Sequence, residues 1–143
     1  MNAKRLSTAI LVLLLASAAA RTQDLVVIVN PGSRIERLTK FQVIDIFMGR
    51  FRKLPSGSTA LPIDLGGDGA ERARFYKLLV NKELVEISSY WARLVYSGQA
   101  SPPLLLPDAK TAVDLVANNQ NAIAYVDRAL VDKRVKVVLE LAP

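Results

Sequence analysis

A glycine-rich segment, Gly66-Gly67-Asp68-Gly69, is the stretch of this sequence best suited to contact a small ligand. It follows the apolar run Leu61–Leu65, which predicts a strand, and precedes a helix that we expect to begin near Ala70. Backbone N–H groups of such a loop, at the start of a helix, can hold an anion. An arginine in the first turn adds charge-assisted hydrogen bonds. The predicted ligand-binding residues of this segment are Gly67, Asp68, Gly69 and Arg72.

The same segment has a purely structural interpretation. Asp68 and Glu71 both lie at the expected start of the helix. Acidic side chains there accept hydrogen bonds from the free N–H groups and complement the helix dipole without any ligand. Both interpretations, an anion site and a self-capped helix, therefore stay open from the sequence.

Two further positions are candidate ligand contacts. Ser33 ends the turn that follows the apolar run Leu25–Val29, and its hydroxyl is placed to cap a ligand. Arg50 follows the expected helix stop at Gly49 and offers a second positive charge. Each has a simpler explanation, because turns commonly end strands and basic residues commonly follow helix C-termini.

The composition removes most catalytic chemistry. The chain of 143 residues has no Cys and no His, so thiol chemistry, disulfides and imidazole bases are excluded, and the common zinc ligands are missing. No carboxylate pair for acid/base work is evident, although Asp64 and Asp68 flank the glycine-rich turn and are near enough along the chain to approach each other. We therefore expect a protein that is not an enzyme and that uses no cofactor or metal.

The aromatic residues near the middle of the chain favour a core role. Trp91 lies one turn after Ile87 and about one turn before Leu94, which predicts an apolar helix face packed in the core. Tyr96 and Tyr125 are candidates for hydroxyl groups at the surface. The basic residues are interleaved with acidic ones, so we expect no nucleic-acid partner.

The start of the chain predicts export. Lys4 and Arg5 form a basic region, residues 9–16 (AILVLLLA) are apolar, and small residues follow up to Ala20. This order is typical of a cleavable signal peptide, and the apolar run is shorter than the roughly 20 residues that span a bilayer. We predict a signal peptide at residues 1–20, a single domain at residues 21–143 and a periplasmic location.

The remaining segments predict an α/β fold. Leu25–Val29 is β-branched without polar alternation, as in a strand buried on both faces. Thr39 and Gln42 form a capping box for a helix with Phe41, Ile44 and Met48 on its apolar face. The other expected elements are helices at 70–80, 83–96 and 109–118 and strands at 61–65, 122–126 and 135–141. This order favours a small mixed sheet flanked by helices.

Several of these segments resemble phosphate-binding proteins of ABC importers. Phe41–Arg50 (FQVIDIFMGR) is similar to the helix and stop of "DIFLGR" type in that family, and Asn121–Val126 (NAIAYV) is similar to its "GAIGYV" strand. Leu61–Tyr76 lies where the family has a strand, a loop and a helix. Ser88–Gly98 resembles a segment of short, single-domain relatives. The resemblance covers about residues 26–126.

The resemblance implies one lobe of the type II periplasmic-binding fold. Full members of the family close two lobes around phosphate and are roughly twice as long. Asp68 and Gly69 match the Asp-Gly of the family's phosphate loop, whereas its Ser and Thr hydroxyls are missing here. The implied function is a periplasmic substrate-binding-like protein for phosphate or another small anion, acting with a membrane transporter or sensor. The alternative is a non-catalytic interaction module without anion binding, which docks a transporter subunit, a sensor or another copy of itself.

Overall fold

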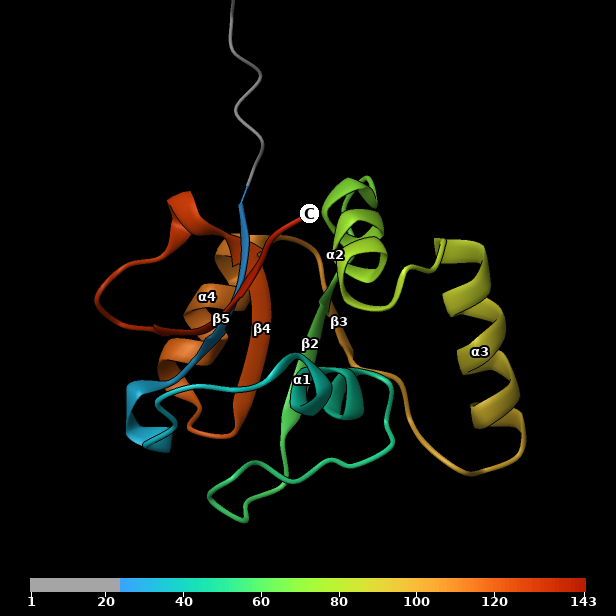
Figure 1. The fold of residues 1–143 in the computed structure, drawn as a ribbon, viewed down its shortest axis with the longest axis horizontal. Coiled ribbons are helices and arrows are strands. Elements are labelled where there is room, and N and C mark those ends of the chain that lie inside the picture. Colours follow the sequence, from blue (N-terminus) through green and yellow to red (C-terminus); the bar gives the residue numbers. More distant parts are fainter. Residues whose placement is uncertain (1–23) are drawn as a thin grey trace, which may run out of the picture.

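A computed structural model describes residues 24–143, so the predicted signal peptide at residues 1–20 lies outside the described residues. The described chain forms a five-stranded mixed sheet flanked by helices (Figure 1), which confirms the predicted α/β fold. The strands are β1 (Leu25–Val29), β2 (Leu61–Leu65), β3 (Leu104–Leu106), β4 (Ala122–Asp127) and β5 (Lys136–Leu141). The helices are α1 (Lys40–Phe47), α2 (Ala70–Val80), α3 (Leu84–Tyr96) and α4 (Ala109–Asn118), with short 3-10 turns at Pro31–Ser33 and Arg128–Leu130.

The strand directions decide which loops meet. The sheet order is β3-β2-β4-β1-β5, with β2 parallel to both β3 and β4. β1 runs antiparallel to β4, so that Leu25 is paired with Asp127 and Val29 with Ile123. We call the edge where β2, β3 and β4 end the carboxyl edge, and the edge where they begin the amino edge. β1 therefore begins at the carboxyl edge and ends at the amino edge.

The core lies on both faces of this sheet. All five residues of β1 are buried, as its unbroken apolar sequence predicts. On one face, Phe47 of α1 and Phe75 of α2 pack on Tyr125 of β4, with the Phe75 and Tyr125 rings stacked 3.7 Å apart. Figure 1 shows α1 and α2 beside β2, α4 beside β4, and α3 at one end of the molecule.

Local capping explains where the helices begin. The hydroxyl of Thr39 accepts a hydrogen bond from the N–H of Gln42 at 3.2 Å, and the Gln42 side chain accepts one from the N–H of Thr39 at 2.8 Å. The predicted capping box is therefore confirmed. Asp108 caps α4 through the N–H of Thr111 at 2.7 Å. No helix among residues 24–143 has both the length and the apolar content that a membrane span requires.

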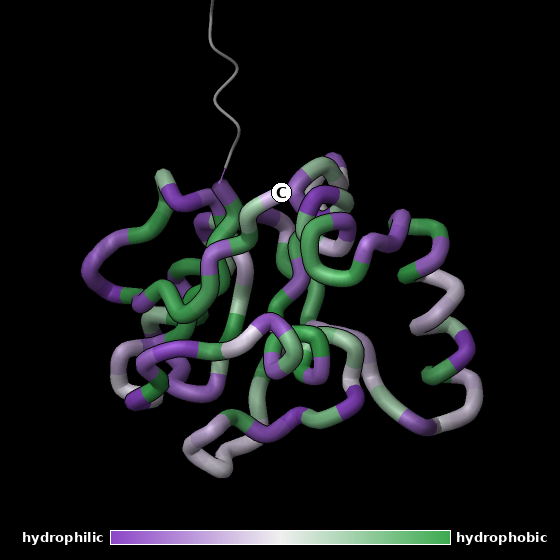
Figure 2. The backbone as a smooth tube through the Cα atoms, viewed as in Figure 1, coloured by the Kyte–Doolittle hydropathy of each residue, from purple (hydrophilic) through white to green (hydrophobic). Residues whose placement is uncertain are grey.

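Two sequence predictions about these elements were wrong. The short strand β3 was not among the strands expected from the sequence; parallel pairing with β2 forms it directly after Pro102 and Pro103. The predicted apolar face of α1 was wrong for Phe41, which is 81% exposed, whereas Met48 is buried as expected, together with Val43, Ile46 and Phe47. Figure 2 shows hydrophobic (green) and hydrophilic (purple) segments alternating along α3, and Val85, Val95 and Tyr96 of this helix are exposed.

Candidate functional site

The glycine-rich loop lies at the carboxyl edge, between β2 and α2. Gly67 and Gly69 have φ values of +57° and +82°, a conformation that side chains rarely adopt. The N–H of Gly66 donates to the carbonyl of Leu106 at 2.8 Å, which ties the loop to the end of β3. Asp108, the cap of α4, follows two residues later, so α2 and α4 both begin beside this loop.

Acidic side chains already occupy this edge. Asp68 Oδ1 accepts a hydrogen bond from the N–H of Ala70 at 2.9 Å, as the self-capped interpretation expects. Burial, together with the charges of Asp127 and Asp68, raises the pKa of Glu71. Among residues 24–143, Glu71 Oε2 is a buried oxygen without a hydrogen-bond partner. The carboxylates of Asp68, Glu71 and Asp127 therefore lie close enough at this loop for their charges to act on one another.

Directly below the loop, Asp64 forms the centre of a buried polar network. Asp64 is 2% exposed although its side chain ends in a polar carboxyl group. Its Oδ2 accepts hydrogen bonds from Arg72 Nε and from the Tyr76 hydroxyl, both at 2.9 Å. Its Oδ1 accepts from the Tyr125 hydroxyl and, at 3.0 Å, from the N–H of Leu65. The network joins β2, β4 and α2, the three elements that hold the loop in place.

The network keeps its protons at neutral pH. Burial, with the neighbouring charge of Asp64 and the hydrogen bond to it, raises the pKa of both Tyr76 and Tyr125 above the ordinary value. Burial lowers the pKa of Arg72, but the charge and hydrogen bond of Asp64 outweigh this effect and raise it. These groups therefore stay as two neutral phenols and a guanidinium around one carboxylate. The hydrogen bonds of these groups to Asp64 join β2 to α2 and β4.

The structure brings four of the six predicted ligand residues to one place. Gly67, Asp68 and Gly69 form the loop, and Arg72 lies in the first turn of α2. Arg72, however, directs its Nε at Asp64, so its charge is paired within the protein. The positive charge available at the loop is smaller than the sequence suggested.

Ser33 lies at the opposite edge of the sheet from this loop. It follows the end of β1, which reaches the amino edge because β1 is antiparallel to β4. The preceding Asn30 donates its side-chain N–H groups to the carbonyls of Val116 and Ala117 at the end of α4, at 3.0 and 2.9 Å. The structure therefore does not bring Ser33 together with Gly67, Asp68 and Gly69.

Arg50 is also separate from the loop. It follows Gly49, whose α-carbon lies against Trp91 in the middle of α3, whereas Gly69 lies beside Leu84 at the start of α3. Leu84 and Trp91 are seven residues, or about 10 Å, apart along α3, so Gly49 and Gly69 lie at different places along this helix. Arg50 is exposed, and its N–H donates to the carbonyl of Asp45 at 2.9 Å. The chain after it turns back to β2 at the amino edge, since the carbonyl of Arg52 accepts from the N–H of Ala60.

Three other sequence interpretations can be compared with the structure. Trp91 is 5% exposed, which confirms its core role. Tyr125 is fully buried, so the prediction of a surface hydroxyl was wrong for it, although Tyr96 is 96% exposed. Asp64 and Asp68 do not act as a pair, because Asp64 is buried in its own network while Asp68 is exposed and caps α2.

The sequence reasoning missed the network around Asp64. Its partners Tyr76 and Tyr125 are 12 and 61 residues away, beyond the reach of spacing arguments. One signal was available: Asp64 is a carboxylate inside the apolar run Leu61–Leu65, and a buried charge requires partners. Residues 24–143 contain no group of three His, Cys, Asp or Glu side chains placed to hold a metal ion.

The chain is similar to known proteins in its fold and not in its sequence. The sequence matches no protein-family model and no curated protein sequence. Among solved structures, an ABC-type phosphate transport receptor from Vibrio cholerae aligns with 80% of this chain at a TM-score of 0.64 and 18% identity. The chain has the fold of one lobe of such a protein. It spans less than half of that receptor, 45% of its length.

Two further solved structures agree with this likeness. A putative phosphate ABC transporter substrate-binding protein from Clostridium perfringens, solved with bound phosphate, has a TM-score of 0.64 and 18% identity over 80% of this chain and 44% of its own. A possible phosphate-binding protein from Planctomyces limnophilus has a TM-score of 0.58 and 15% identity over 80% of this chain and 40% of its own. The expected resemblance to part of a phosphate-binding protein is therefore confirmed at the level of the fold.

Proposed function

We propose that this protein is a periplasmic substrate-binding-like protein that binds phosphate or a similar small anion as part of transport or sensing, without catalysing a reaction. The observation that supports it best is the place of the loop Gly66–Gly69. In a fold that is similar to part of phosphate-binding proteins, this loop lies where β2 ends and where α2 and α4 begin. Ligands of open α/β sheets gather at such carboxyl ends.

Asp68 has a defined role under this proposal. A monohydrogen phosphate carries one proton, and the exposed carboxylate of Asp68 is an acceptor for it. The backbone N–H of Gly67 contacts another oxygen, whereas the N–H of Gly69 already donates to the carbonyl of Gly66 at 3.1 Å. Sulfate has the same shape but no proton at neutral pH, so Asp68 would repel it. The proposed site therefore prefers phosphate to sulfate.

Isothermal titration calorimetry with sodium phosphate and sodium sulfate tests this function. We expect phosphate to release or absorb heat with a dissociation constant below about 1 mM, and Asp68→Asn to weaken it about tenfold or more, since a hydrogen bond to a charged group is lost. Asp45→Asn, which removes a carboxylate from α1, is the matched control and should leave binding unchanged. Heat that is absent for both anions at about 10 mM would exclude the anion site.

The second candidate is an interaction module, and the acidic side chains at the loop favour it. Asp68, Glu71 and Asp127 make this edge negative, and Arg72 is paired with Asp64. Such an edge suits a basic segment of a transporter subunit or sensor. Here Asp68→Asn would strengthen any residual phosphate binding, because it removes repulsion. The direction of the Asp68→Asn effect therefore separates the two candidates.

A further inference from the structure

Helix α3 carries an uncharged face that none of the residues 24–143 covers. Three large apolar side chains on it are exposed: Val85 by 72%, Val95 by 53% and Tyr96 by 96%. The other members of the face, all exposed, are Ser88, Ser89 and Ala92. The opposite side of α3 packs on the core through Ile87 and Trp91. A helix that faced only water would carry charges on its outer side, so this face is typical of a contact surface.

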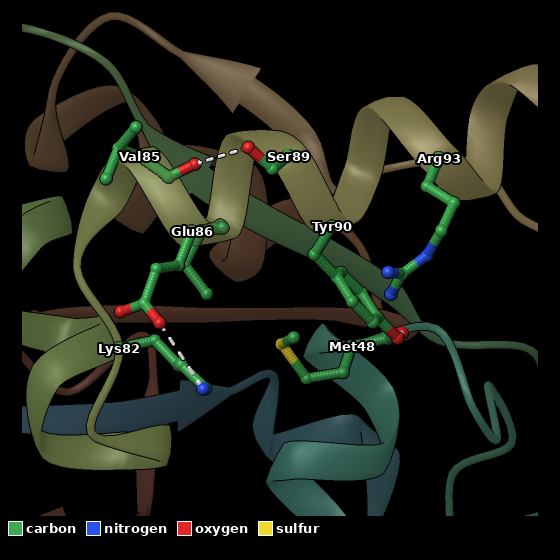
Figure 3. A pocket seen from close by; sticks show the side chains of 8 residues that line it. Met48, Lys82, Val85, Glu86, Ser89, Tyr90 and Arg93 are labelled. Carbon is green, nitrogen blue, oxygen red and sulfur yellow. Dashed lines mark hydrogen bonds and ion pairs between the residues drawn. The ribbon is translucent and has the colours of Figure 1, made fainter.

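Two charged residues flank the face on one side. Glu86 and Arg93 are seven residues, or two turns, apart and line a groove of about 470 Å³ between α3 and the end of α1. Figure 3 shows the side chains of Glu86, Tyr90 and Arg93 extending from α3 toward the groove that Lys82 and Met48 also line. The Arg93 guanidinium lies 5.8 Å from the Tyr90 ring, and no carboxylate of the described chain forms an ion pair with it. Glu86 accepts the N–H of Glu83 at 2.9 Å and forms an exposed ion pair with Lys82 at 3.4 Å, a surface contact that contributes little on its own.

We propose that this face binds a second copy of the chain, with the two α3 helices packed antiparallel about a twofold axis near residue 90. Residues at equal distances from the axis then meet, so Val85 of each copy lies opposite Val95 of the other. Glu86 likewise meets Arg93 of the other copy, because both charges are on the same flank and antiparallel helices place like flanks together. A parallel pair would put the two flanks on opposite sides and leave these charges apart. The charge pattern therefore selects an antiparallel partner that is this same chain.

The centre of the face suits close helix packing. Ser88, Ser89 and Ala92 are small, so the two backbones can approach to the 8–10 Å typical of packed helices. The contact is limited in length, because α3 has 13 residues and spans about 20 Å. A surface of this size lies at the small end of specific interfaces. We therefore expect a weak dimer in exchange with the monomer, with a dissociation constant between about 1 μM and 1 mM.

Sedimentation velocity over a range of protein concentrations measures whether this face forms a dimer. The protein is expressed from the full sequence, and its mass after purification is verified. We expect Ala92→Arg to raise the dissociation constant of the dimer about tenfold or more, because it places one unpaired charge from each copy at the centre of the contact. Leu105→Arg is the matched control: Leu105 is 58% exposed on β3, the edge strand, and should not matter. A protein that stays monomeric at about 1 mM, or a dimer broken by Leu105→Arg and not by Ala92→Arg, would overturn the proposal.

Cysteine cross-linking tests the orientation, since the chain has no Cys of its own. In the antiparallel pair the two copies of residue 89 are offset by about 3 Å along the helices, whereas the two copies of residue 85 are offset by about 15 Å. Oxidation should therefore link Ser89→Cys chains into a covalent dimer and leave Val85→Cys chains unlinked, because a disulfide requires α-carbons within about 7 Å. Equal linking of both variants would indicate a parallel pair and refute the antiparallel one.

Discussion

Replacing Asp64 with alanine is the sharpest test of the buried network. The change removes the acceptor of the Tyr76 hydroxyl, of the Tyr125 hydroxyl and of Arg72 Nε. Because the site is buried, water does not replace this acceptor unless the surrounding structure opens. Tyr125 keeps one hydrogen bond, since its oxygen accepts the N–H of Leu65 at 3.1 Å. Tyr76 and Arg72 lose their only side-chain acceptor within the described chain.

The expected cost follows from these losses. Removing one partner of a buried ion pair costs about 3–5 kcal/mol, because the remaining charge stays buried and unpaired. Arg72 is 25% exposed and recovers part of its hydration, so the cost lies toward the lower end of this range, and the stranded Tyr76 hydroxyl raises it again. Domains of this size are stable by about 5–15 kcal/mol, so Asp64→Ala should remove at least about a fifth of the total.

Urea unfolding followed by the fluorescence of Trp91 measures this cost. Trp91 is the single tryptophan and is 5% exposed, so unfolding shifts its emission. Tyr76→Phe is the matched comparison: it removes one donor to a carboxylate and leaves Asp64 three others, so it should cost only about 1.5–3 kcal/mol. If Asp64→Ala costs less than about 1 kcal/mol, or no more than Tyr76→Phe, the carboxylate is not the centre of the network and the reasoning is wrong.

Three further predictions concern the loop and the first helix. Glu71→Gln should stabilise the fold at pH 7 by at most about 1 kcal/mol, since this residue is partly solvated. The pKa of Glu71 in the folded state is raised above the ordinary 4.5, so folding favours the protonated form. The stability gained by Glu71→Gln should therefore vanish in urea titrations below pH 4.5, where the glutamate is protonated in both states. An equal gain at both pH values would contradict an origin in the Glu71 charge. Gly69→Ala should cost about 1 kcal/mol of unfolding free energy because of the φ of +82°, and an unchanged urea midpoint would count against this strain. Thr39→Ala should cost about 1 kcal/mol through loss of the α1 cap, whereas Thr39→Ser should cost little; equal losses in both would argue against the hydroxyl.

Much of the element pattern was determined by the sequence alone, because its causes are local. The Thr39–Gln42 capping box, the Asp108 cap and the unbroken apolar run of β1 each depend on residues within a few positions of one another. Such signals act whatever the rest of the chain does. The place of the glycine-rich loop between β2 and α2 was predicted for the same reason.

The tertiary structure alone decided how the loops and side chains come together. The antiparallel direction of β1 sends Ser33 to the amino edge, away from Asp68, and no local signal fixes that direction. Pairing with β2 makes a strand of Leu104–Leu106, and packing on α2 buries Tyr125 and gives Asp64 its partners. These contacts join residues far apart in the sequence, and only the folded chain brings them within hydrogen-bond distance.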